Sequence, residues 1–170
     1  MDVQSVLLGF LMRNSMTGYD LKKAFSMSFS FFSGLSYGSI YPALKKMEKL
    51  GLISKTVEIQ DGAPNRKVYT LTEEGRKALF ESLRMPPVPE RHKSSFLMRL
   101  FFFAYLTPEE RKAIAAEHLD SVERLRSQLE AFRPEIEVRA DRFQLLCFEF
   151  GLRMYRDLAH NLSEVVKALE

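Results

Sequence analysis

The chain is organised around one stretch, SYGSIYPALKKMEKLGLI, which occupies residues 36–53. Three apolar residues within it recur at spacings of four and three: Ile40, Leu44 and Met47. This spacing places their side chains along one side of an α-helix, since about 3.6 residues complete each turn. We therefore predict a helix that buries this side against a core.

Both ends of this helix carry sequence signals. Ser39 is a suitable N-cap, and Pro42 then falls in the first turn, where proline has no intrahelical hydrogen bond to lose. Ser36 is an alternative starting point. Gly51 can adopt the left-handed conformation that ends a helix, and a strand can begin at Leu52.

The other side of the predicted helix is polar and basic. Four residues lie there: Tyr41, Lys45, Lys46 and Lys49. Three ammonium groups and a phenol suit the phosphates and base edges of DNA. An ordinary solvated helix face has the same composition, since exposed lysines are common. The elements predicted on either side of this helix distinguish a DNA-binding face from an ordinary solvated face.

Two further helices are predicted before the central one. Residues 3–13 carry two apolar rows, and Thr17 can cap a second helix that ends near Ser28. A short helix, a break and the central helix together make up a helix-turn-helix unit.

A β-hairpin is predicted directly after the central helix. Residues 52–59 and 66–71 are rich in β-branched side chains and flank the turn-forming residues 60–65. A hairpin at this place is the wing of a winged helix-turn-helix, and its basic residues could reach a minor groove or the flanking phosphates. The predicted DNA-binding residues are Ser36, Tyr37, Ser39, Tyr41, Lys45, Lys46, Lys49, Arg66 and Lys67.

The chain is predicted to form two domains. Thr72 can cap a helix that runs to about Arg84 and closes the first domain, residues 1–84. Residues 85–93 contain three prolines and are predicted to be a linker. Residues 94–170 are predicted to form a helical dimerisation domain. The predicted fold class of the whole chain is therefore mostly α with a small β-hairpin wing.

Homodimerisation is expected from the apolar surface of the second domain. Residues 96–106 are apolar almost all round, and we expect that helix to be covered on several sides. After a helix at about 107–132, the last helix runs from about Glu135 or Asp141 to Ala168 and carries two apolar rows, of which a two-helix hairpin can cover one. The expected dimerisation residues are Phe96, Leu100, Phe103, Val122, Leu125, Leu129, Phe150, Met154, Leu158 and Leu162.

Charge and composition restrict the function classes. Residues 1–84 hold 12 Lys and Arg against 8 Asp and Glu, a net charge of +4, which fits an anion-binding first domain. The single cysteine, Cys147, is interpreted as a small core residue and fits a reducing cytoplasm. His92, His118 and His160 lack metal-ligand spacing, so we predict no metal, no cofactor and no enzymatic activity. No apolar run approaches the ~20 residues of a membrane-spanning helix.

Several motifs resemble those of the PadR family of bacterial transcriptional regulators. They are GYDL at residues 18–21, YPAL at 41–44, LGL at 50–52 and RKVYTLTEEG at 66–75. The resemblance implies a winged helix-turn-helix, a helical C-terminal segment that forms the homodimer, and a role as a ligand-responsive repressor.

The residues and the resemblance together predict a DNA-binding transcriptional regulator. It should bind a pseudo-palindromic operator as a homodimer and respond to a small aromatic or apolar effector, which the aromatic residues around Phe25 and Phe101 also suggest. The alternative is a dimeric module whose winged helix binds a protein, since fold does not fix function. The basic residues of the central helix and Arg66 favour DNA.

Overall fold

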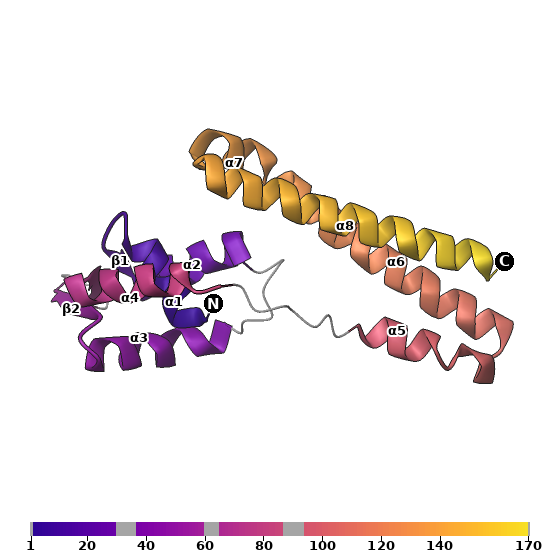
Figure 1. The fold of residues 1–170 in the computed structure, drawn as a ribbon, viewed down its shortest axis with the longest axis horizontal. Helices are drawn as coiled ribbons and strands as arrows, with labels where there is room; N and C mark the ends of the chain where they lie inside the picture. The colour runs from indigo at the N-terminus through magenta and orange to yellow at the C-terminus, as the bar shows by residue number, and fades with distance from the viewer. Residues whose placement is uncertain (1, 30–36, 60–64, 87–93, 170) are drawn as a thin grey trace. The chain divides into compact units, whose positions relative to one another are not determined.

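A computed structural model describes residues 2–29, 37–59, 65–86 and 94–169 (Figure 1). The chain divides into two compact units, Met1–Pro89 and Glu90–Glu170. Each unit is treated by itself below. Among the described residues, no helix combines the length and hydropathy that a membrane span needs.

The N-terminal unit is a winged helix-turn-helix. Its elements are α1 (Val3–Leu11), β1 (Met16–Thr17), α2 (Gly18–Phe29), the 3-10 turn η1 (Tyr37–Ser39), α3 (Ile40–Lys49), β2 (Ile53–Glu58), β3 (Arg66–Leu71) and α4 (Glu73–Arg84). The mostly helical fold with a small β wing is therefore confirmed. The central helix, the hairpin and the helix capped by Thr72 lie within one to three residues of their predicted bounds.

The sheet contains one strand that the sequence analysis missed. Its strand order is β1-β3-β2, and β2 pairs antiparallel with β3 from Ile53 opposite Leu71 to Glu58 opposite Arg66. On the other edge, β1 pairs Met16 with Tyr69. Residues 14–18 have turn-like side chains, and a two-residue strand has no periodicity that the sequence could show, because it forms only by pairing with β3.

The predicted apolar side of α3 is the centre of the first core. Ile40, Leu44 and Met47 are almost completely buried, together with Leu21 and Phe25 of α2. Helix α1 contacts α2, α3 and α4, and its Leu7 side chain has no exposed surface. One continuous cluster therefore holds α3 in place from behind.

The first turn of α4 fixes the connection between α3 and β2. Gly51 ends α3 with φ 71°, the left-handed conformation predicted for it. The Thr72 hydroxyl donates a hydrogen bond to the Gly51 carbonyl oxygen at 2.7 Å, and the Thr72 N–H donates to the Leu52 carbonyl oxygen at 3.2 Å. Gly75 packs so closely that a Cβ there would overlap the Leu52 carbonyl oxygen.

The C-terminal unit is a pair of long helices with three shorter elements. They are α5 (Ser95–Leu100), the 3-10 turn η2 (Phe103–Tyr105), α6 (Pro108–Ala131), α7 (Arg133–Arg139) and α8 (Arg142–Ala168). The single helix predicted over residues 96–106 is wrong, because the chain turns at Phe101 and Phe102 and continues as η2. The alternatives for the last helix are both partly right: a short helix follows Arg133, and Asp141 caps the long one.

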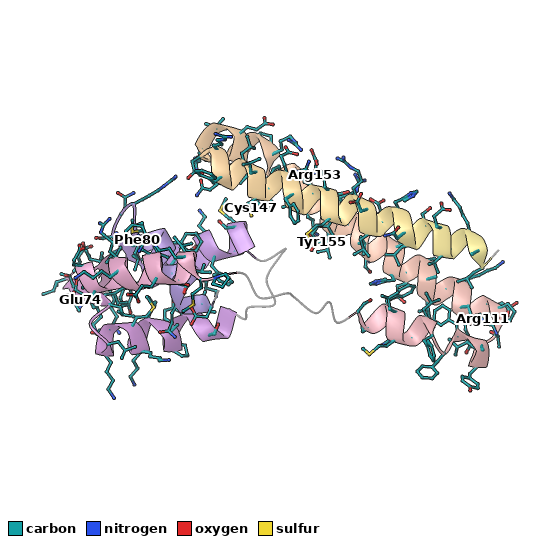
Figure 2. The ribbon with its side chains drawn as sticks, in the orientation of Figure 1. Glu74, Phe80, Arg111, Cys147, Arg153 and Tyr155 are labelled. Atoms are coloured by element: carbon teal, nitrogen blue, oxygen red, sulfur yellow. The ribbon has the colours of Figure 1, made fainter. Side chains whose placement is uncertain are left out.

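Helices α6 and α8 pack lengthwise against each other (Figure 1). The buried side chains between them include Val122 and Leu129 from α6 and Leu152 and Leu162 from α8. Tyr155 is half-buried and packs against this core, whereas Arg153 points away from α6 (Figure 2).

Arg133 ties the corner between these two helices together. Its guanidinium donates to the carboxylates of Glu130 and Glu149, both at 2.6 Å, and lies 5.2 Å from the centre of the Phe148 ring. The hydrogen bond from Arg133 lowers the pKa of Glu149, and the same pair raises the pKa of the guanidinium.

Candidate nucleic-acid interface

Helix α3 presents a basic face, defined here as Tyr41, Lys45, Lys46 and Lys49. All four side chains are exposed, and the Tyr41 side chain keeps 54% of its surface accessible. In the described parts of the chain, none of the three lysines has a carboxylate within ion-pair distance. Long side chains with nitrogen tips extend from α3 into solvent (Figure 2). Positive charge without an internal partner is available to an external anion.

The start of α3 differs from the prediction in one respect. Ser39 precedes the helix, but its φ of −82° and ψ of −13° are already helical and its side chain makes no capping hydrogen bond. The reason is that η1 leads directly into α3, so the backbone coils before Ile40. Tyr37 belongs to η1, and Ser36 lies outside the described residues. Pro42 occupies the first turn, as predicted.

Gly18 sets the position of the Tyr41 ring. A Cβ at Gly18 would lie 2.9 Å from Tyr41 Cε1 and 3.6 Å from the phenol oxygen. The ring therefore lies over the first residue of α2, which is buried although it begins a helix. Glycine allows this close approach of the aromatic ring, and it keeps the phenol at the surface.

The wing brings two further basic residues to the same unit. Arg66 and Lys67 begin β3 and are both exposed. One Arg66 guanidinium nitrogen lies 4.0 Å from Asp20 Oδ2, and Asp20 is held by the Thr17 hydroxyl, which donates to it at 2.6 Å. A loose ion pair at this distance orients Arg66 and leaves most of its hydrogen-bond donors available.

A second ion pair joins α3 to the wing. Lys55 Nζ of β2 lies 2.6 Å from Glu48 Oε1 of α3. This hydrogen bond raises the pKa of Lys55, and burial raises the pKa of Tyr69, which stands opposite Lys55 in the hairpin. Lys55 is therefore an internal tie rather than a free cation of the basic face.

The ten predicted dimerisation residues differ in burial and fall into three groups. Five are buried in the core of their own chain, so their burial requires no partner: Phe96, Phe103, Val122, Leu129 and Leu162. Leu100 is half-buried against that core. Four are exposed within one chain: Leu125, Phe150, Met154 and Leu158. Only the exposed class remains available to a second subunit.

Three of those exposed residues belong to a longer apolar row on α8. We call Phe143, Leu146, Phe150, Met154 and Leu158 the α8 row, with exposed fractions between 42% and 76%. Cys147 lies beside it and is exposed (Figure 2), so its interpretation as a core residue is wrong. The expectation that one row of α8 is covered and the other uncovered holds as far as Leu158, whereas Leu162 of the second row is buried.

A second apolar surface lies at α5 and η2. Phe101 and Tyr105 keep 81% and 86% of their surfaces exposed, and Phe102 packs edge-on against Phe101 with ring centres 5.1 Å apart. Only Phe96 and Phe103 of this segment are buried. The C-terminal unit by itself therefore does not provide the predicted coverage on several sides.

The histidines of the described residues lie on separate elements. No group of three or more His, Cys, Asp or Glu side chains is arranged to hold a metal ion there. His118 stacks on Phe96 with ring centres 4.6 Å apart, which is a packing role. His160 is exposed on α8.

Two family models match the chain. Residues 7–81 match the transcriptional regulator PadR-like family, and residues 92–170 match the virulence activator alpha C-terminal family. The negative transcriptional regulator PadR of Bacillus subtilis is 28% identical over 146 residues, which cover 85% of this chain and 80% of that protein.

Solved structures of similar proteins have the same fold over nearly the whole chain. The PadR-like transcriptional regulator BC1756 of Bacillus cereus is 27% identical, with a TM-score of 0.87 over 99% of this chain and 98% of that one. The smu.1604c protein of Streptococcus mutans is 32% identical, with a TM-score of 0.86 over 96% and 98%. Bacillus subtilis PadR, 24% identical with a TM-score of 0.85 over 98% of both chains, was crystallised with operator DNA, and another crystal contains p-coumaric acid.

Proposed function

The chain belongs to the PadR-like family of transcriptional regulators, and from that premise we propose that it binds duplex operator DNA as a homodimer. The observation that carries this proposal is the basic face of α3. It lies opposite the buried residues Ile40, Leu44 and Met47, so the helix is anchored on one side and cationic on the other.

Each part of the interface has a distinct role in this proposal. The first turn of α3 enters the major groove, where the Tyr41 phenol can meet base edges. Lys45, Lys46 and Lys49 bind phosphates along the groove. Arg66 and Lys67 of the wing reach the neighbouring backbone or the minor groove.

The homodimer is proposed from the α8 row. Five large apolar side chains along one helix, together with Leu125 and the exposed rings of Phe101 and Tyr105, form more apolar surface than a soluble monomer leaves in water. A two-fold axis relates two recognition helices, so the operator is a pseudo-palindrome with half-sites about one helical turn apart.

The proposed mode of action is repression relieved by a small aromatic or apolar molecule. Its support is the Bacillus subtilis relative, which is a negative regulator and has been crystallised with p-coumaric acid. Such a molecule acts only if it binds the DNA-incompetent arrangement more tightly, by about 1 to 3 kcal/mol for a 5- to 150-fold change in operator affinity.

The test is operator binding by the triple variant Lys45→Ala, Lys49→Ala, Arg66→Ala. The homodimer loses three contacts per subunit and six in all, so we expect the log–log salt slope to fall by about 5. Its affinity should fall by at least about 100-fold, at about 0.5 kcal/mol per lost contact. The matched control is Arg76→Ala, Lys77→Ala, Arg84→Ala, which removes three charges from α4, a helix that packs against α1. The same assay, titrated with phenolic acids, tests the effector.

Equal binding by the triple variant and the wild-type protein, with both folded, would show that the DNA-binding surface lies elsewhere. A panel of phenolic acids that leaves operator affinity unchanged would refute the effector proposal without affecting the DNA-binding one.

A further inference from the structure

We infer that α2 supplies a third phosphate-binding element, formed by the exposed side chains of Tyr19, Lys22 and Lys23 together with the half-buried Ser26. We call these four residues the α2 sector. The inference rests on the proposed DNA binding and extends it to a helix that the sequence analysis treated only as part of the scaffold.

The first turn of α2 lies between the two proposed DNA-binding elements. On one side, Gly18 is covered by the Tyr41 ring of α3, with a Cβ position 2.9 Å from Tyr41 Cε1. On the other side, Asp20 approaches the Arg66 guanidinium of the wing at 4.0 Å. Two independent contacts thus place the start of α2 between the recognition helix and the wing.

The α2 sector faces outward between these two contacts. Each residue turns an α-helix by about 100°, so a residue lies almost above the one four positions earlier. Going round α2 from Gly18, the order is Lys22, Ser26, Tyr19, Lys23 and then, after Met27, Asp20. The sector therefore begins beside the Tyr41 contact and ends near the Arg66 contact.

Two apolar residues of α2 face the protein interior. Leu21 and Phe25 have no exposed surface, and both lie on the side of Gly18 away from the α2 sector. The orientation of the helix is therefore fixed by its core residues. The α2 sector cannot rotate away from the surface that the basic face of α3 and Arg66 share.

The chemistry of the α2 sector suits phosphates. Lys22 and Lys23 are exposed, and neither has a carboxylate partner in the portion of the chain that the structure describes. Tyr19 keeps 71% of its surface exposed, and its ring, both lysines and Ser26 line one surface hollow. Ammonium and hydroxyl groups are the usual donors to phosphate oxygens. Lys55 differs from these two lysines, because it forms an ion pair with Glu48.

The expected ligand is the sugar-phosphate backbone of the same duplex that α3 enters. In helix-turn-helix proteins the helix before the recognition helix crosses the backbone. Contacts to phosphates position the protein but carry no sequence information. The α2 sector should therefore strengthen binding to every duplex by the same factor.

The test uses the full-length variant Lys22→Ala, Lys23→Ala and two duplexes. One duplex is selected by the wild-type protein from a random-sequence pool, and the other is its scrambled counterpart. The homodimer loses two contacts per subunit, so we expect the log–log salt slope to fall by about 4 on both duplexes, since each phosphate contact contributes about 0.9. The ratio of the two affinities should stay unchanged, and Lys22→Arg, Lys23→Arg should restore the slope.

The control variant Lys77→Ala, Arg84→Ala removes the same charge from α4 and should leave the slope close to that of the wild-type protein. The inference alone would be overturned if Lys22→Ala, Lys23→Ala had the same salt slope as this control, while substitution of Lys45 or Arg66 still weakened DNA binding. A wild-type protein that selects no duplex would overturn both this inference and the proposed function. Thermal unfolding of each variant checks that the exposed substitutions leave the fold intact.

Discussion

Helices α3 and α8 each bury one row of side chains and expose another, but the exposed rows differ in chemistry. The basic face of α3 is cationic, with Lys45, Lys46 and Lys49 in water. The α8 row is apolar, with Phe143 at 76% and Phe150 at 61% exposure. The exposed row of α3 is therefore well hydrated, whereas the exposed row of α8 is apolar and poorly hydrated.

This difference predicts two kinds of association. Exposed ammonium groups are well solvated, so α3 needs no partner to fold and should bind a polyanion reversibly and in a salt-dependent way. Burying exposed apolar side chains away from water lowers the free energy, so α8 should form a permanent subunit interface. The stability of that interface should depend little on salt concentration.

The largest expected effect comes from placing charge in the α8 row. The double variant Phe150→Glu, Met154→Glu should raise the dissociation constant of the homodimer by more than about 1000-fold, because each unpaired carboxylate costs several kcal/mol in an apolar interface. Sedimentation or light scattering at micromolar concentration measures the change. Both side chains are exposed in the single chain, so the monomer should remain folded.

Arg156→Glu provides the control, because it changes the net charge by the same amount on a polar side of α8, where Arg156 is exposed. It should stay dimeric. A double variant that remains a dimer, or a wild-type protein that is a stable monomer, would show that the α8 row is not the subunit interface.

An intermediate effect is expected from a substitution inside the N-terminal unit. Gly75→Ala should lower the free energy of unfolding of that unit by about 3 kcal/mol, because its Cβ would overlap the Leu52 backbone, which cannot move as a flexible side chain can. The transition of the C-terminal unit should be unchanged in calorimetry, since the two units have separate cores.

Gly9→Ala is the matched control in the same unit. A Cβ at Gly9 would meet no atom within 4 Å, and alanine favours the helix by about 1 kcal/mol. The two substitutions should therefore shift the N-terminal transition in opposite directions. Equal shifts would contradict the close packing of α4 on the strand connection.

The smallest expected effect is a pH dependence in the C-terminal unit. Because the pKa of Glu149 is lowered by Arg133, its carboxylate stabilises the folded unit above the ordinary pKa of glutamate, and this contribution disappears as the pH falls through the lowered value. Glu149→Gln should lower the melting temperature by about 2 °C at pH 7 in low salt and by nothing at a pH below the folded pKa.

Glu137→Gln gives a comparison at the same guanidinium. The Glu137 carboxylate lies 3.4 Å from Arg133, against 2.6 Å for Glu149, so its removal should change the melting temperature less. An effect of Glu149→Gln that persists at low pH would mean that lost packing, rather than lost charge, is responsible.

The sequence predicted those elements whose signals are local. The spacing of Ile40, Leu44 and Met47 located α3, and the Thr72 cap located α4, whose Gly75 N–H donates to the Thr72 hydroxyl at 3.1 Å. Each of these signals operates within a few residues, so no knowledge of the tertiary structure was needed.

The misses arose where tertiary contacts decide the outcome. Strand β1 exists because Met16 pairs with Tyr69, more than fifty residues away. The break after α5 was not predicted, because the sequence there contains no glycine or proline. The exposed side of α2 was missed because Tyr19, Lys22 and Lys23 could lie on any solvated helix, and only the tertiary contact between Gly18 and Tyr41 places them beside the basic face of α3.

The tie between α4 and the α3–β2 connection has a thermodynamic consequence. Thr72 and Gly75 hold the peptide groups of Gly51 and Leu52, while Glu48 and Lys55 join the two elements further along. The angle between α3 and the wing is thus set when the domain folds, and its conformational entropy is lost at that stage. Association with a duplex then has less disorder to remove, so more of the contact free energy appears as affinity.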